Sequence, residues 1–277
     1  MKRIAAIQMT SSEDVAKNLQ EAERLILKAA ALGAQLVVLP ENFALMGKTE
    51  QDKLKISETF GEGPIQDFLA KQAAKNKIWL VGGTIPITSE NPQKVYAACL
   101  IYNAHGDRVA RYDKIHLFDA QVKRDVEVYE ESNTTEYGDH LTVVDTPFGR
   151  LGVAVCYDIR FPELFRAMLV EKVDIIAVPA AFTVKTGEAH WEVLMRARAI
   201  ENFCYIIGAC QTGTHTNGRQ TYGHALIVNP WGETLTRLTT QVDVITATID
   251  HDKQHQMRED FPTALHQRIG IDTSKLK

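Results

Sequence analysis

The sequence predicts an α/β layer fold. Strand-like and helix-like segments alternate through most of the 277 residues, which argues against both a helix bundle and an all-β sandwich. The order begins with a strand over residues 4–9, continues with a helix over 15–32 and returns to a strand over 36–39. Hydrophobic residues make up 45% of the chain and charged residues 24%, as in an ordinary globular enzyme, so we expect a packed core.

The first elements are defined by the spacing of their apolar residues. Apolar residues recur at three- and four-residue steps over 15–29, which forms one face of a helix, and Gly33 ends that helix. The run over 36–39 is apolar throughout and is closed by Pro40, as in a strand that is buried on both faces. Glu41 therefore follows the carboxyl end of a buried strand.

The rest of the chain continues the alternation, without repeats or low-complexity linkers. His105-Gly106-Asp107 is typical of a β-hairpin turn. Residues 115–137 form a long charged segment without clear periodicity, which is typical of a functional loop. The further strands are expected at 78–85, 95–103, 108–112, 142–145, 151–155, 175–178, 205–210, 224–228 and 244–249, and the further helices at 162–170 and 188–202.

The composition argues against several classes of function. The net charge is −4 and no block of Lys or Arg builds a positive stripe, so nucleic acid is not an expected partner. No apolar run is long enough to span a bilayer, and the stretch over 4–9 is too short for a secretory signal, so no membrane partner is expected. The four cysteines lack the CxxC spacing of a zinc site, which predicts no metal and a reducing, cytoplasmic location.

Cys156 is a candidate nucleophile. It ends the apolar strand over 151–155 just before a polar turn and a predicted helix, and such a turn presents a side chain at the edge of a sheet. The N–H group of Tyr157 is then placed to donate to an oxyanion one residue away. Taken alone, however, a cysteine at a strand end is more often a small buried hydrophobe, and its thiol needs a nearby base or cation to react.

Glu41 and Lys114 supply a base and a cation at two other strand ends. Glu41 follows a buried strand, where ligands gather in α/β sheets. Lys114 follows the strand over 108–112 and precedes an apolar and aromatic run. Each residue by itself is more often an exposed loop glutamate or a solvated lysine at the rim, so only their combination with Cys156 is informative.

Three longer segments surround these residues. They are Leu39-Pro40-Glu41-Asn42-Phe43, Tyr112-Asp113-Lys114-Ile115-His116-Leu117-Phe118-Asp119 and Gly152-Val153-Ala154-Val155-Cys156-Tyr157-Asp158-Ile159-Arg160-Phe161-Pro162-Glu163-Leu164. Together with the stretches over 186–191, 196–202 and 229–232, these segments resemble the carbon-nitrogen hydrolases of the nitrilase superfamily. Their order and wide spacing make coincidence a poor explanation, and the resemblance extends from the first strand to about Ile249.

This resemblance implies a four-layer α-β-β-α sandwich without a cofactor. It implies a single carbon-nitrogen hydrolase domain over residues 1–277, whose subunits pair through helices as a homodimer or a higher homo-oligomer. The segment 250–277 is expected to be a C-terminal tail involved in subunit contact.

The resemblance also implies a thioester mechanism for amide hydrolysis. Glu41 takes the thiol proton as Cys156 attacks the amide carbonyl, and Lys114 helps to hold the oxyanion. Water activated by Glu41 then cleaves the thioester. Members of the family often carry a second glutamate after the lysine, and here Glu131 matches best, with Glu130 as its rival.

Four residues are expected to bind the substrate. Tyr157 directly follows the nucleophile, and Phe182 and Thr183 follow a strand that ends at the same sheet edge, although those two could equally be local packing. An anionic keto acid would need a positive group near the acyl pocket, and Arg160 is a plausible carboxylate partner. Its alternative is an ion pair with Asp158 or Glu163.

Two substrates fit the resemblance, and other functions stay open. Residues 131–136 and 211–224 most resemble the deaminated glutathione amidases, which release 2-oxoglutarate and the dipeptide Cys-Gly. Residues 229–233 are shared with the omega-amidases, which act on 2-oxoglutaramate and release ammonia. A nitrilase would use the same residues on a carbon-nitrogen triple bond, and a binding protein built on this fold would need no intact catalytic set.

Overall fold

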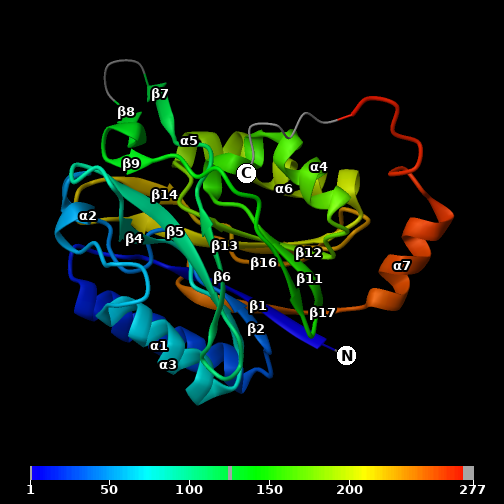
Figure 1. Cartoon of the computed structure of the whole chain (residues 1–277), viewed down its shortest axis with the longest axis horizontal. Coiled ribbons are helices and arrows are strands. Elements are labelled where there is room, and N and C mark those ends of the chain that lie inside the picture. Colours follow the sequence, from blue (N-terminus) through cyan, green and yellow to red (C-terminus); the bar gives the residue numbers. More distant parts are fainter. Residues whose placement is uncertain (1, 124–126, 271–277) are drawn as a thin grey trace.

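The computed structural model describes residues 2–123 and 127–270, and two β-sheets with helices on their outer faces make up its body (Figure 1). None of the helices in these ranges is both long and apolar enough to cross a bilayer. The helices are α1 (Val15–Ala31), α2 (Asp52–Lys55), α3 (Pro64–Asn76), α4 (Pro162–Val170), α5 (Val184–Thr186), α6 (Glu192–Asn202) and α7 (His251–Asp260).

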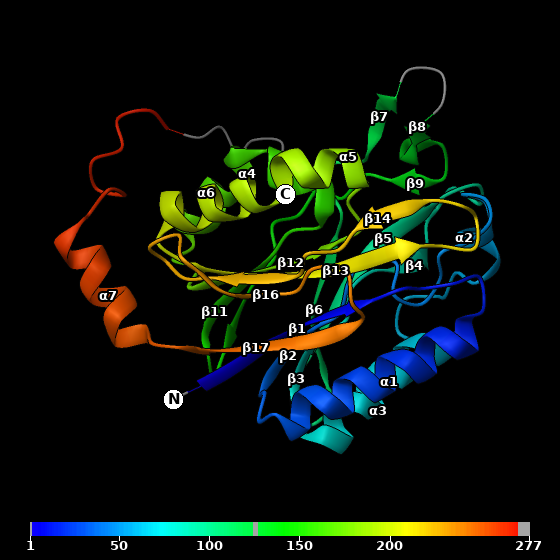
Figure 2. The same cartoon turned by 180° about the vertical axis from the view of Figure 1, so that it is seen from behind.

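Helices α1 and α3 cover one sheet, and α4 and α6 cover the other, as the view from behind also shows (Figure 2). This arrangement confirms the α-β-β-α sandwich. The first sheet contains β17 (Asp243–Ile249), β1 (Lys2–Met9), β2 (Leu36–Val38), β3 (Trp79–Val81), β5 (Val95–Tyr102), β4 (Ile85–Thr88), β6 (Arg108–Asp113) and β9 (Thr135–Glu136); the second contains β10 (Val143–Thr146), β11 (Gly149–Val153), β12 (Ile175–Ala180), β13 (Tyr205–Thr214), β14 (Gln220–Tyr222), β15 (Leu226–Val228) and β16 (Thr234–Arg237).

Strand β1 is buried on both faces, which is why it carries no polar alternation. Ile4 and Ala6 belong to an apolar cluster shared with the second sheet, whereas Ala5 and Ile7 pack in the cluster that contains the inner faces of α1 and α3. Successive side chains of a strand point to opposite faces, so one short segment contributes to both parts of the core.

The two sheets are joined through one short pairing. Strands β1 and β13 pair in parallel through Gln8 with Cys210 and Met9 with Gln211, at the carboxyl end of β1. Strands β11, β12 and β13 are mutually parallel, as are β1, β2 and β3. The loops that follow β2, β11 and β12 therefore emerge at the same edge, where α/β sheets commonly bind ligands.

The prediction of a single strand over 78–85 is wrong, because the chain turns between β3 and β4. At Gly83 the backbone φ is +61°, and a Cβ atom there would lie 2.2 Å from the carbonyl oxygen of Pro40. Only glycine fits this close approach without strain. The turn places Thr84 where its hydroxyl accepts a hydrogen bond from the N–H of Asn42 at 2.8 Å, next to Glu41.

Helix α3 was not expected from the sequence. Its buried face includes Gln66 and Gln72 among the apolar residues, which interrupts the hydrophobic stripe. Gln66 is tolerated there because its amide nitrogen donates to the Glu58 carboxylate at 3.1 Å and to two backbone carbonyls. These partners become available only after the chain has folded.

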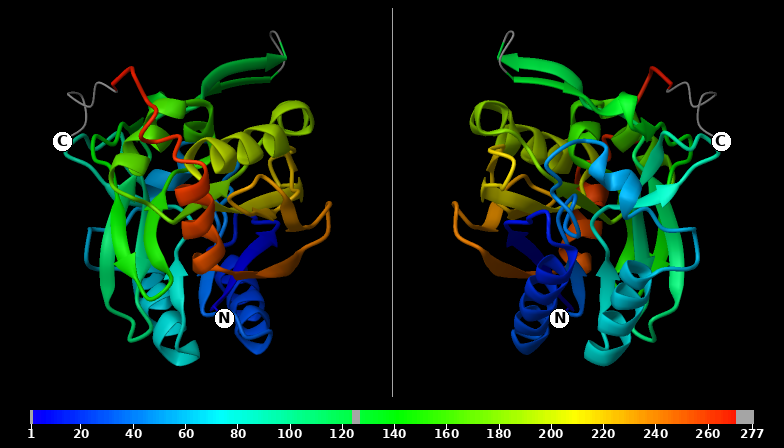
Figure 3. Two further views of the ribbon diagram at one scale, coloured as in Figure 1. Left: turned by 90° about the vertical axis from the view of Figure 1, so that its right-hand side faces the viewer. Right: turned by 90° about the vertical axis from the view of Figure 1, so that its left-hand side faces the viewer.

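The segment 115–137 is more regular than the predicted loop. It contains a hairpin of β7 (Asp119–Lys123) and β8 (Glu127–Glu130), which projects from the body in Figure 3, and a short helical turn over Glu131–Asn133. Residues 124–126 lie outside the described residues. The turn over Glu131–Asn133 brings the acidic part of this segment back toward β6.

The described part of the tail 250–277 packs against its own chain through α7. The Gln254 amide donates to the carbonyls of Asp174 and Phe203, both at 2.9 Å, and Arg258 donates to the Asp174 carboxylate at 2.9 Å. Residues 271–277 lie outside the described residues. A role of this tail in subunit contact stays a prediction.

We expect Gly83→Ala to destabilise the protein more than Gly218→Ala. Both glycines have positive φ, which costs an alanine about 1 kcal/mol, but an added Cβ meets nothing within 4 Å at Gly218 and the backbone at Gly83. The free energy of unfolding in urea should fall by at least about 2 kcal/mol more for Gly83→Ala. Equal losses in the two variants would contradict this account of the turn.

Candidate active site

The candidate residues follow strands whose ends meet at one edge of the sandwich. Glu41 follows β2, Lys114 follows β6 and Cys156 follows β11. Strand β6 is antiparallel to β5, which is antiparallel to β3, so β6 runs in the same direction as the central strands. Three segments that are remote in the sequence therefore deliver their side chains to one place.

Lys114 lies between two carboxylates in the interior. Its side chain is 2% exposed, and its Nζ donates to Glu41 Oε1 at 2.8 Å and to Glu131 Oε2 at 2.8 Å. A buried ammonium is tolerated when it is paired and hydrogen-bonded in this way. The structure thus places Glu131 against Lys114, while Glu130 accepts a hydrogen bond from Asn133 at 2.8 Å instead.

Cys156 lies at a strained turn beside this cluster. Its φ is +47°, a conformation that non-glycine residues rarely adopt, and its side chain lines the same pocket as Glu41 and Lys114. The Glu41 carboxylate, the Lys114 ammonium and the N–H of Ala181 all act on the pKa of the thiol. The sulfur therefore lies within electrostatic reach of a carboxylate, an ammonium and a backbone donor.

The electrostatics of the cluster keep the thiol protonated at rest. Burial and the charge of Glu41 raise the pKa of Cys156 well above its ordinary value, and the Lys114 ammonium only partly offsets them. Burial lowers the pKa of Lys114, but the charges of Glu131 and Glu41 outweigh it and hold that pKa well above its ordinary value. The cluster therefore holds a charged lysine beside a neutral thiol.

The pKa of Glu131 is displaced in the direction that keeps it ionised. Burial raises this pKa, but the Lys114 charge, together with a hydrogen bond from the N–H of Phe118 at 2.7 Å, brings it below its ordinary value. Glu131 is therefore an acceptor that keeps Lys114 charged and fixed in position.

The backbone of Glu41 is held by the junction between the two sheets. The Gln211 amide donates to the Glu41 carbonyl at 3.0 Å and to the Ser11 hydroxyl at 2.7 Å, and that hydroxyl donates to the Phe43 carbonyl at 2.8 Å. Gln211 and Ser11 are both fully buried. Sequence reasoning missed both residues, because neither polar side chain is distinctive until β1 and β13 pair.

Asp158 is a third residue whose role the sequence did not indicate. It is completely buried and accepts from the Val155 N–H at 2.7 Å, the Tyr112 hydroxyl at 2.6 Å and His116 through its backbone and Nδ1 at 2.9 and 2.7 Å. The carboxylate therefore ties the turn around Cys156 to the segment around Lys114. Its place two residues after Cys156 was the available signal.

Two pockets meet at Cys156. The larger pocket, of about 410 Å³, contains the charged cluster, and the smaller pocket, of about 220 Å³, lies on the side of Tyr157. The larger pocket is lined by Glu41, Asn42, Glu50, Lys53, Lys114, Phe118, Tyr129, Glu130, Glu131, Cys156 and Arg219; the smaller is lined by Phe118, Cys156, Tyr157, Arg160, Ala181, Phe182, Thr183 and Thr186.

The structure brings all four expected substrate-binding residues to the smaller pocket. The guanidinium of Arg160 lies 5.3 Å from the centre of the Phe182 ring and hydrogen-bonds His190 Nδ1 at 3.1 Å. The alternative of an ion pair with Asp158 or Glu163 is not what the described residues show. Arg160 therefore keeps a guanidinium that is free of a carboxylate partner among the described residues.

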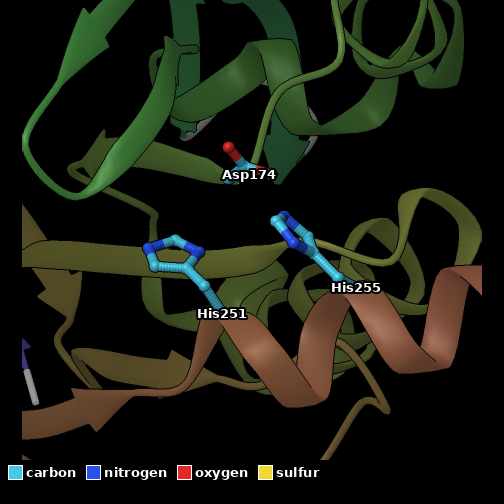
Figure 4. A group of neighbouring side chains, drawn as sticks. All are labelled: Asp174, His251 and His255. Carbon is cyan, nitrogen blue, oxygen red and sulfur yellow. The ribbon is translucent and has the colours of Figure 1, made fainter.

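One group of side chains elsewhere has the composition of a metal site. Asp174, His251 and His255 have ligand atoms within 4.8 Å of one another (Figure 4). Both oxygens of Asp174 are already bonded, however, one to the Arg258 guanidinium and the other to the Arg150 N–H, each at 2.9 Å. The arginine charge opposes a cation here. The group also lies at the amino end of β12, about 20 Å from the carboxyl end of that strand, which is the end near the candidate active site. We assign it to holding α7.

The geometry matches the family that the sequence motifs indicated. The carbon-nitrogen hydrolase family matches residues 3–259. The chain belongs to the carbon-nitrogen hydrolase family. This carbon-nitrogen hydrolase is 41% identical over 267 residues to the deaminated glutathione amidase of Yersinia enterocolitica, which covers 96% of this chain and 93% of that protein. It is 38% identical over 272 residues to the human deaminated glutathione amidase, covering 97% and 83%.

Two solved structures are similar over almost the whole carbon-nitrogen hydrolase. The Caenorhabditis elegans NitFhit protein superposes with a TM-score of 0.89 at 36% identity over 96% of this chain, which spans 65% of that longer protein. Saccharomyces cerevisiae Nit3, a member of branch 10 of the nitrilase superfamily, superposes with a TM-score of 0.87 at 31% identity over 97% of each chain. The protein is therefore an enzyme that hydrolyses carbon-nitrogen bonds, as an amidase.

We expect Glu41→Gln to lower the pKa of the Cys156 thiol. The Glu41 charge opposes ionisation of the sulfur, and the glutamine removes that charge while leaving Lys114 in place. The rate of alkylation by iodoacetamide, followed against pH by mass spectrometry, should therefore rise at a lower pH than in the unchanged enzyme. Glu130→Gln, at a carboxylate of the same pocket bonded to Asn133, serves as the control. A midpoint that stays in place or moves to higher pH would contradict this electrostatic account.

Proposed function

We propose that this enzyme hydrolyses deaminated glutathione to 2-oxoglutarate and Cys-Gly through a thioester on Cys156. The observation that carries the proposal is that the Cys156 thiol, the Glu41 carboxylate and the Lys114 ammonium line one pocket, with Lys114 bonded to Glu41 at 2.8 Å. The choice of substrate is supported by the deaminated glutathione amidases, which match the chain at up to 41% identity.

In the first step Glu41 accepts the thiol proton while the sulfur attacks the amide carbonyl. A carbon–sulfur bond forms, and the carbonyl oxygen becomes an oxyanion held by Lys114 and by the N–H of Tyr157. Burial and the Glu41 charge raise the pKa of the resting thiol well above its ordinary value, so the base acts at the moment of attack rather than on a preformed thiolate.

In the second step Glu41 returns the proton to the leaving nitrogen. The carbon–nitrogen bond breaks, the free amine departs, and the acyl group remains on Cys156. Water then transfers a proton to Glu41 and attacks the thioester, and collapse of the second tetrahedral intermediate releases the carboxylic acid and restores the thiol. Glu131 takes no proton in this scheme, because it keeps Lys114 charged throughout.

The acyl group is expected to extend into the smaller pocket. The 2-oxoglutaryl group carries a carboxylate at its far end, and the Arg160 guanidinium is the cation of that pocket. Phe182 and Thr183 line the pocket beside it. Tyr157 packs edge to face against Phe118, with the ring centres 5.1 Å apart, and closes one wall. Arg160 would thus set the preference for an anionic acyl chain.

We further propose a homodimer or higher homo-oligomer that works in the cytoplasm. All four cysteines are free and buried, which suits a reducing compartment. Helices α4 and α6 expose apolar side chains toward solvent, with Val170 69%, Val193 67% and Ile200 46% exposed. An exposed apolar surface on two adjacent helices is typical of a subunit interface.

The oligomer is tested by Val193→Glu combined with Ile200→Glu. Two carboxylates on the exposed face of α6 would be buried on association, so we expect the mass measured by light scattering to fall toward that of one chain. Val128→Glu, on the projecting hairpin, is the matched control and should leave the mass unchanged. An unchanged mass in the α6 variant would exclude this face as the interface.

The catalytic proposal is tested by mass spectrometry of the acyl-enzyme. With deaminated glutathione, we expect the mass of one 2-oxoglutaryl group on Cys156, and Cys156→Ala should lose hydrolysis by at least about 10³-fold with the fold intact. Full activity in Cys156→Ala would overturn the mechanism. Faster hydrolysis of 2-oxoglutaramate would favour an omega-amidase, and ammonia from a nitrile would favour a nitrilase.

A further inference from the structure

The proposed chemistry assigns the two halves of the substrate to different pockets. Glu41 must reach the leaving nitrogen to protonate it, and a general acid acts only within hydrogen-bonding distance. Glu41 lines only the larger pocket, and Arg160 lines only the smaller one. The leaving amine therefore lies in the larger pocket, a conclusion that rests on the function proposed above.

In the part of the chain that the structure describes, the larger pocket holds one cation without an acidic partner. Lys114 is bound by Glu41, and Lys53 lies 2.7 Å from the Glu50 carboxylate. Arg219 has no carboxylate within ion-pairing distance among the described residues. The charged side chains that line the pocket are Glu41, Glu50, Glu130, Glu131, Lys53, Lys114 and Arg219.

Contacts at two sides hold the Arg219 guanidinium in place. Its Nη2 donates to the Ala181 carbonyl at 2.9 Å, and the group lies 5.0 Å from the centre of the Tyr129 ring. Its Nε is buried and has no hydrogen-bond partner within residues 2–123 and 127–270. A buried donor without an acceptor is unfavourable, and a carboxylate is the acceptor that a guanidinium binds best.

The backbone around Arg219 is equally fixed. Its N–H donates to Asn217 Oδ1 at 2.9 Å, and its carbonyl accepts from the His215 N–H at 2.9 Å. His215 is itself buried and hydrogen-bonded to the Ser11 carbonyl and the Thr221 hydroxyl, both at 2.8 Å. The side chain thus projects from a rigid hairpin, as a specificity group requires.

The distance from Cys156 to Arg219 matches the length of a dipeptide. Cys156 and Arg219 line the same pocket, and the Arg219 guanidinium donates to the carbonyl of Ala181, a residue that lines the smaller pocket beside Cys156. The sulfur and the guanidinium are therefore on the order of 10 Å or less apart, and an extended dipeptide spans about 7 Å. Glu50, Tyr129 and Arg219 also line a groove that opens outward, which leaves room for the end of a peptide.

We propose that Arg219 forms a subsite for the terminal carboxylate of the leaving amine. In deaminated glutathione this is the carboxylate of the glycine residue. The subsite makes the enzyme prefer an amide whose amine carries an anionic end, in contrast to a primary amide that releases ammonia. Arg160 and Arg219 then bind the two ends of one substrate, on opposite sides of the scissile bond.

The test compares two substrates that share the same acyl group. Arg219→Gln is expected to lower kcat/KM for deaminated glutathione by about 10- to 100-fold, the range for a hydrogen bond to a charged group. It should leave kcat/KM for 2-oxoglutaramate within about twofold, because that substrate has no carboxylate on its leaving amine. Arg24→Gln, an arginine of α1 paired with Glu21, is the control and should change neither value.

A third substrate isolates the carboxylate itself. Deaminated glutathione with an amidated C-terminus should be a poorer substrate for the unchanged enzyme and should be insensitive to Arg219→Gln. Equal losses on all three substrates, or no loss on any, would overturn the subsite. Arg160→Gln should instead impair every substrate with the 2-oxoglutaryl group.

A binding measurement separates the subsite from the proposed function. Cys-Gly and its C-terminal amide are titrated by NMR into Cys156→Ala, with and without Arg219→Gln. Tighter binding of the free acid that disappears in Arg219→Gln supports the subsite even if neither keto-amide is hydrolysed, a result that would refute the proposed function alone. Equal binding of the acid and the amide would overturn the subsite whatever the enzyme hydrolyses.

Discussion

The buried ion cluster of Glu41, Lys114 and Glu131 is the constraint on which the site depends. An ammonium that is 2% exposed is stable only while both carboxylates remain bonded to it, so three remote segments must meet within hydrogen-bonding distance. The same charges decide the state of the nearby sulfur. Because burial and the Glu41 charge raise the pKa of the thiol, and Lys114 is shared with Glu131, the sulfur rests as a neutral group beside Glu41.

The fold meets this constraint at the single short junction between its two sheets. The pairing of β1 with β13 buries Gln211 beside the Glu41 backbone, and Asp158 ties the turn of Cys156 to the segment that carries Lys114. These polar contacts provide hydrogen-bond partners for backbone groups that are not paired within the sheets and would otherwise need water. The strained φ of Cys156 persists because the surrounding hydrogen bonds fix the residues on both sides.

The site is also asymmetric about the sulfur, and this asymmetry gives it a direction. In the proposed mechanism, the groups that transfer protons lie in the larger pocket, whereas the smaller pocket offers an arginine and aromatic side chains without a base. A substrate would therefore react in one orientation only, with its nitrogen toward Glu41. A longer leaving amine would then extend toward Arg219, and a longer acyl group would extend toward Arg160.

The sequence by itself determined the elements whose signal is local. The spacing of apolar residues set the buried strands β1 and β2 and helix α1 with its end at Gly33, and these predicted an α/β layer fold. The motifs around Glu41, Lys114 and Cys156 resemble those of carbon-nitrogen hydrolases, and this resemblance implied the family and the four-layer sandwich. The tertiary structure decided the features that depend on contacts between residues remote in the sequence. It broke the predicted strand at Gly83 through contact with Pro40, buried Gln66 in α3 and placed Glu131 rather than Glu130 on Lys114. Nothing in the sequence distinguishes Arg219 from other polar residues. Only the folded chain shows that it has no acidic partner among the residues that the structure describes.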